Sequence, residues 1–77
     1  MNKLRRKNLA TIIARLEEVK ADFEELISEE EDYLDAFPEN LQGSERYERA
    51  EEGLSYLNDA YDYFDEVIDN INSAIEA

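Results

Sequence analysis

The chain has 77 residues, with 21 acidic and 8 basic side chains, no His and no Cys, and a formal net charge of −13. A chain of this length forms one domain and buries only about 60% of its unfolded surface, so added stability must come from helix packing or association. The lack of His and Cys excludes imidazole or thiolate metal sites and most nucleophile–base pairs. The negative charge disfavours nucleic acids and anionic membranes as partners.

The first half of the chain carries apolar residues at alternating intervals of three and four, interrupted only by Glu30. This heptad pattern predicts an amphipathic helix over about residues 4–36. Ile13, Ile27 and Leu34 widen the apolar stripe along the adjoining column. The predicted seam positions are Leu9, Ile12, Leu16, Val19, Phe23, Leu26, Tyr33 and Phe37.

The second half repeats the pattern without interruption and predicts a second helix over about residues 45–76. Ala60, Val67 and Ala74 widen its stripe on one side. Its predicted seam positions are Tyr47, Ala50, Leu54, Leu57, Tyr61, Phe64, Ile68, Ile71 and Ile75.

A linker at residues 37–44 separates the two helices. Pro38 disfavours helical geometry at the residue before it, and Ser44 is a natural N-cap for the second helix. Two helices of matched length with a short connection fold back on one another. We therefore expect a single all-α domain, an antiparallel two-helix hairpin with heptad seams.

Each apolar stripe is wider than one partner helix covers. We therefore expect two hairpins to pair as a homodimer, a four-helix bundle. The alternative is that the remaining apolar edge docks on a different protein. The expected oligomer seam consists of the residues that widen the stripes: Ile13, Ile27, Leu34, Ala60, Val67 and Ala74.

One basic and one acidic cluster are candidate functional sites. The basic cluster Lys3, Arg5, Arg6 and Lys7 could contact phosphates, but pairing with carboxylates at the end of the second helix is favoured. The acidic run at 29–32 lacks the glycine and ligand spacing of a calcium loop, and Glu30 could be solvated or paired with Arg46 or Arg49 across the turn. We expect no metal and no cofactor.

The hydroxyl residues have no His to activate them, and carboxylates on straight helices do not form a cleft. We expect that the protein is not an enzyme. The basic start is followed by an apolar stretch that Arg15, Glu17 and Glu18 interrupt, so neither a signal peptide nor a membrane span is predicted. A location in the cytoplasm is expected.

From residue 8 onward there are 4 basic and 21 acidic residues, so the outer faces of both helices are almost purely acidic. Such a face could imitate a nucleic-acid backbone and occupy a basic surface, although a solvated face is the plainer interpretation. Exposed tyrosines among acids are plausible interface anchors. The candidate protein-binding residues are Glu52, Tyr56, Asp59, Asp62, Tyr63 and Glu66.

The segment 29–77 contains Pro-Glu-Asn-Leu-Gln followed after one glycine by Ser-Glu-Arg-Tyr-Glu. It resembles small uncharacterised acidic helical proteins of bacteriophages and mobile elements of Gram-positive bacteria. The resemblance implies a phage context in a bacterial host cell and brings no assigned activity. The leading hypothesis is a protein-binding module that inhibits a host protein. The alternative is a structural protein whose helices only oligomerise.

Overall fold

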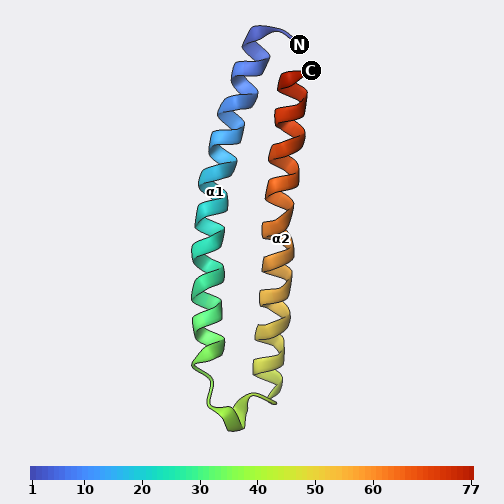
Figure 1. Cartoon of the computed structure of the whole chain (residues 1–77). Helices are drawn as coiled ribbons and strands as arrows, with labels where there is room; N and C mark the ends of the chain where they lie inside the picture. Colours follow the sequence, from blue (N-terminus) through green and yellow to red (C-terminus); the bar gives the residue numbers. More distant parts are fainter.

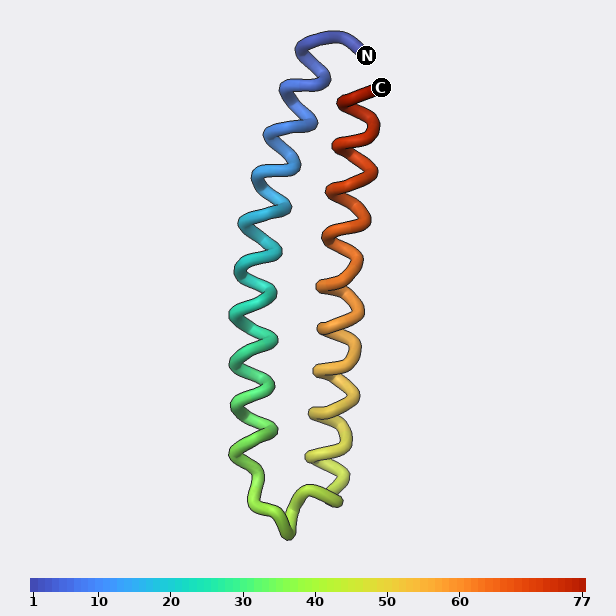
Figure 2. The backbone as a smooth tube through the Cα atoms, in the orientation of Figure 1, coloured from blue at the N-terminus to red at the C-terminus, as the bar shows by residue number.

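The computed structural model covers residues 1–77 and contains two long helices, α1 (Lys3–Asp35) and α2 (Glu45–Glu76), with a short 3₁₀ helix η1 (Glu39–Leu41) between them. The helices lie antiparallel and side by side, with both termini at one end and the turn at the other (Figure 1). The backbone trace shows no other layer (Figure 2), and the molecule measures 59 × 16 × 12 Å. The predicted all-α hairpin is confirmed.

Side-chain caps and the linker sequence define where the helices begin and end. Asn2 Oδ1 accepts a hydrogen bond from the Arg5 amide at 2.8 Å, and Ser44 Oγ accepts one from the Tyr47 amide at 3.3 Å. Each cap satisfies an amide that has no partner within its helix. The predicted Ser44 cap is therefore confirmed, and α1 ends two residues before Phe37, the residue that precedes proline.

Contact between the helices buries one narrow line of side chains. Only Ile27, Leu34 and Ile68 are buried, while the flanking inward residues are half-buried. On α2 all nine predicted seam positions are buried or half-buried, so the prediction for this helix is confirmed.

The predicted seam of α1 is wrong in one of its two columns. The column of Leu9, Leu16 and Phe23 faces α2, as predicted. The second column that faces α2, however, is not the predicted one but the column on the opposite side of these three residues. Ile27 is 7% exposed, whereas Leu26, assigned to the seam, is 55% exposed. The residues of the column that faces α2 are Ile13, Lys20, Ile27 and Leu34, and those left outside are Ile12, Val19, Leu26 and Tyr33.

The observed rotation of α1 brings Lys20 into contact with α2. In the observed orientation Lys20 Nζ lies 2.5 Å from Asp65 Oδ1 and 5.2 Å from the centre of the Tyr61 ring. The predicted seam would turn Lys20 away from both partners. Since apolar residues lie on both sides of the Phe23 column, the apolar pattern alone does not distinguish the two rotations.

Aromatic edge-to-face contacts order the turn end of the hairpin. The Phe37 ring lies 5.1 Å from that of Tyr33 and 5.2 Å from that of Tyr47, measured between centroids. Leu41 borders the same cluster in a shallow pocket with Tyr33 and Arg46. Phe37 therefore ends the hydrophobic seam by bridging the last turn of α1 and the first turn of α2.

The orientation of α1 predicts unequal effects for two adjacent substitutions. Ile27→Ala should destabilise the hairpin by about 2–4 kcal/mol, because it removes buried methylene groups and leaves a cavity. Leu26→Ala should change stability by less than about 1 kcal/mol in dilute solution, because its side chain is mostly in water. Urea unfolding followed by circular dichroism measures both, and equal losses would contradict the observed rotation.

Candidate protein-binding surface

The two broad faces of the hairpin differ in chemistry. One of them, the polar face, is crossed by hydrogen bonds that join the helices. Lys20 Nζ donates to Asp65 Oδ1 at 2.5 Å, and the Tyr61 hydroxyl donates to Glu24 Oε2 at 3.4 Å. These contacts couple α1 to α2 near mid-length, so this face already has partners within the chain.

The fold perturbs the ionisation of Lys20. Its hydrogen bond to Asp65 raises the pKa of the ammonium group above its usual value of 10.5, and the charges of Asp65, Tyr61 and Glu17 act in the same direction. Partial burial opposes this effect without cancelling it. Lys20 is therefore held in its charged form next to the seam.

The opposite face, here called the apolar face, has no such cross-links. It exposes a column of large residues on α1 beside a column of small residues on α2. A pocket between the columns is lined by Leu16, Phe23, Ala60, Tyr63, Phe64 and Val67 without a charged residue. The large column is Ile12, Val19, Leu26 and Tyr33, and the small column is Gly53, Ala60, Val67 and Ala74.

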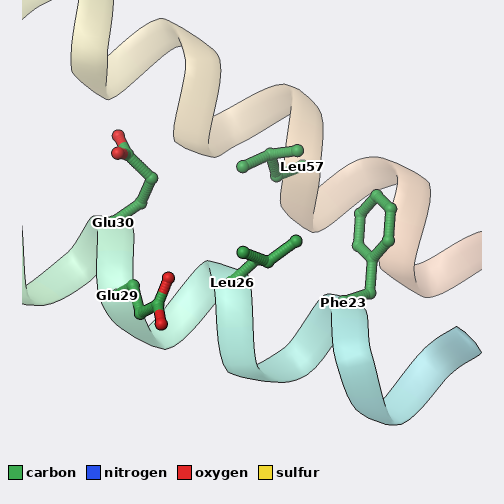
Figure 3. A pocket seen from close by; sticks show the side chains of 5 residues that line it. All are labelled: Phe23, Leu26, Glu29, Glu30 and Leu57. Carbon is green, nitrogen blue, oxygen red and sulfur yellow. The ribbon is translucent and has the colours of Figure 1, made fainter.

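Glu30 is the exception on the apolar face. It lines a second pocket with Phe23, Leu26, Glu29 and Leu57, and Figure 3 shows its carboxylate extending toward α2 beside the facing leucines. The side chain is half-buried and no cation lies within 4.0 Å of it. The proposed pairing with Arg46 or Arg49 is not formed, since Arg49 instead pairs with Glu45 at 2.7 Å.

The six candidate protein-binding residues are all exposed. Glu52, Asp59 and Glu66 follow one another at seven-residue intervals, about half a helical turn from the residues that contact α1. They therefore form an acidic column on the outside of α2, with carboxylates about 10 Å apart. Asp62 lies toward the polar face, and Tyr56 and Tyr63 lie toward the apolar face.

The residues of the expected oligomer seam differ in their exposure in the structure. Ile27 and Leu34 are buried and Ile13 is half-buried against α2, so these three do not form a free surface and this part of the prediction is wrong. The apolar column of α1 that is exposed consists instead of Ile12, Val19, Leu26 and Tyr33. On α2, Val67 and Ala74 are exposed and Ala60 is half-buried, so they do lie on the open face.

Few charges are neutralised within the chain. The only ion pairs are Lys20–Asp65 and Arg49–Glu45. The predicted pairing of the basic cluster at residues 3–7 with carboxylates of α2 is not observed, because none of its side chains lies within 4.0 Å of one. Nineteen of the 21 acidic residues consequently have no cation partner.

Comparison with protein-family models, with curated proteins and with solved structures found no significant match. Neither helix has the length and hydropathy together that crossing a bilayer requires. No group of three or more acidic side chains converges on a point where a metal ion could be held. The two most extended surface features of the hairpin are the acidic column of α2 and the apolar face.

Sequence reasoning missed the apolar column of α1 because it assigned that column to the seam. The signal that could have located it is Lys20, the one charged residue among the isoleucines and leucine of its column. A lysine beside a seam is stabilised when a carboxylate of the partner helix can reach it, and its hydrocarbon stem can cover apolar surface.

The Lys20–Asp65 contact predicts a specific alkaline sensitivity. Because the pKa of Lys20 is raised in the folded state, its contribution to stability is full below pH 10.5 and is lost as the pH rises through the higher folded value. The fall in stability above pH 10.5 should be smaller in Lys20→Met, which has no ammonium group to lose. Thermal melts between pH 8 and 12 test this, with Lys7→Met as the exposed control that should behave like the native chain.

Proposed function

We propose that this chain is a non-enzymatic protein-binding module whose acidic surface engages a basic surface on another protein. The observation that carries the proposal is the unneutralised acidic column of α2, formed by Glu52, Asp59 and Glu66 with Asp62 beside it. All four carboxylates are exposed and none has a cation within 4.0 Å. A cationic partner would relieve the mutual repulsion that these charges impose on the fold.

The spacing of the column favours a partner that normally handles nucleic acid. The carboxylates recur about every 10 Å along a straight helix, which gives a rod of negative charge that can enter a basic groove. Tyr56 and Tyr63 stand beside the column and supply aromatic contact area of the kind enriched at binding hot spots. An inhibitor of this type, made by a phage and acting in the bacterial cytoplasm, is consistent with the resemblance of residues 29–77.

Charge reversal tests the acidic column directly. A variant with Glu52, Asp59, Asp62 and Glu66 all changed to Lys should lose binding to its basic partner by about 10- to 100-fold, because attraction becomes repulsion. The probe is the basic protein that the immobilised native chain retains from a bacterial lysate, purified and titrated by calorimetry. Raising the salt concentration should weaken the native complex in parallel.

The matched control moves the same number of charges to α1. Changing Glu17, Glu18, Glu25 and Asp32 to Lys alters the net charge equally but leaves the column of α2 intact. This variant should retain most of the binding. Equal loss in both variants, or binding that does not respond to salt, would overturn the assignment to α2.

We further propose that two hairpins pair through their apolar faces as a four-helix bundle. Only three residues are buried in the single hairpin, whereas Ile12, Val19, Leu26 and Val67 are each more than 40% exposed. Covering these residues would give the chain the core that two helices alone lack. The alternative in which the helices only oligomerise and bind no other protein rests on the same face.

An acidic residue placed on the apolar face should abolish pairing. Light scattering should give the native chain twice its mass of 9.0 kDa, and Leu26→Asp should give the single-chain mass. The control Ser28→Asp adds the same charge to an exposed position on another side of α1 and should remain a dimer. A native chain that stays monomeric at millimolar concentration would rule out the bundle.

A further inference from the structure

The exposed apolar column of α1 recurs every seven residues, so it is symmetric about its own midpoint. Ile12 and Tyr33 lie equally far from the midpoint between Asp22 and Phe23, and so do Val19 and Leu26. Leu4 in the outer column of Glu25 and Leu41 in η1 are also exposed. These six are all of the large hydrophobic residues from 2 to 41 that are at least 39% exposed.

The small column of α2 is symmetric about a midpoint at about the same height as that of α1. Ala60 and Val67 are equidistant from the midpoint between Tyr63 and Phe64, as are Gly53 and Ala74. The Phe23 and Phe64 rings contact one another with centroids 5.5 Å apart, so the two midpoints lie at about the same height on the hairpin. A two-fold axis that lies along the apolar face, perpendicular to the helices and at this height, therefore sets each exposed column against the same column of a second copy.

The charge distribution favours an axis in the same direction. The end with the termini, residues 1–15 and 66–77, has 5 basic and 3 acidic side chains, a balance of +2. The turn end, residues 29–52, has 10 acidic and 2 basic side chains, a balance of −8. Rotation about this axis sets the positive end of one hairpin beside the negative end of the other.

The axis also places Arg15 beside an acidic residue of the second copy. Arg15 and Glu29 are exposed and lie two heptads apart in one column of α1, next to the exposed apolar column and on its side away from α2. They lie on opposite sides of the midpoint, within one residue of equal distance from it. In a symmetric pair Arg15 of each copy is therefore placed near Glu29 of the other, and the contact occurs twice. Glu30 extends toward α2 of its own chain and lies outside this contact.

We infer that the occupant of the apolar face is a second copy of this chain in the opposite-end orientation, with α1 against α1, α2 against α2 and the two turns at opposite ends. The inference rests on the proposed four-helix pairing and specifies its symmetry and its ionic contacts. Large residues then meet large ones between the α1 helices. The small column lets the α2 helices approach closely.

The rival arrangement places both turns at the same end. It would set large residues of α1 against small residues of α2, which is acceptable for packing. However, it would bring the two turn ends together with a balance of −8 each, and Glu30 would lie near Glu30 of the second copy. The charges therefore favour the opposite-end pair.

A label at the turn separates these outcomes. The chain has no Cys, and a Cβ at Gly43 meets nothing within 4 Å, so Gly43→Cys accepts a single spin label. In the opposite-end pair the two labels should be about 60 Å apart, because each lies about 20 residues from the axis at 1.5 Å per residue. In the same-end pair they should be within about 25 Å. A label at Glu25→Cys, near the axis and exposed, should give a short distance in both arrangements.

The outcomes are distinct for the bundle and for its geometry. A monomeric mass would overturn both the bundle and this inference. A dimeric mass with a short distance between the turn labels would overturn the opposite-end orientation alone. A dimeric mass with a distance of about 60 Å, and a short distance at the Glu25 position, would support it.

A charge exchange tests the ionic contact independently. Arg15→Glu and Glu29→Arg should each weaken self-association by about tenfold, because each dimer contains the altered contact twice. An equimolar mixture of the two variants should recover native affinity, since every Glu then faces an Arg in the mixed pair. Glu25→Arg, which changes charge on the outside of α1, should have little effect. Failure of the mixture to recover would overturn the Arg15–Glu29 contact.

Discussion

Two helices in contact can bury only one line of side chains, and the organisation of this protein follows from that limit. Each helix carries apolar residues on three adjacent columns, but its partner covers two of them. Burial is therefore restricted to Ile27, Leu34 and Ile68, and one column on each helix stays in water. A chain with more layers would have hidden these columns in its core. Here they form a continuous apolar face along one side of the hairpin.

A single ionic contact distinguishes the observed rotation of α1 from the one that the apolar pattern also allows. Either rotation of α1 would bury a comparable set of aliphatic residues, so hydrophobic burial distinguishes the two poorly. Lys20 reaches Asp65 and the face of Tyr61 in only one of them. Lys20 is the charged residue that separates the two candidate columns, since the other residues of both are apolar or aromatic. The exposure of Ile12, Val19, Leu26 and Tyr33 is the structural consequence.

The sequence allows the hairpin to be predicted because each of its signals is local. Alternating three- and four-residue spacing, Pro38 after the first helix and the Ser44 cap each act over one or two turns. The nine seam positions of α2 could be identified because one of the two columns that flank the seam is polar, which leaves no competing apolar column on that side. The seam of α1 could not, because Ile12 and Ile13 compete for it and the outcome depends on Asp65 and Tyr61, which are more than 40 residues away. The absence of ion pairs in the basic cluster was likewise not predictable, since long exposed side chains are rarely fixed by sequence proximity.

The acidic column and the apolar face lie on different sides of α2. The two proposed interactions, binding of a basic protein and pairing of two hairpins, therefore use separate surfaces. Glu52, Asp59 and Glu66 point away from α1, whereas Ala60 and Val67 border the open pocket. Pairing of two hairpins through the apolar face would leave both acidic columns in water on the outside of the bundle. The pair would then offer the same acidic column twice, running in opposite directions. A partner that binds one column gains a second attachment only if its own basic surfaces are arranged with two-fold symmetry. Self-association would therefore restrict, rather than compete with, the choice of basic partner.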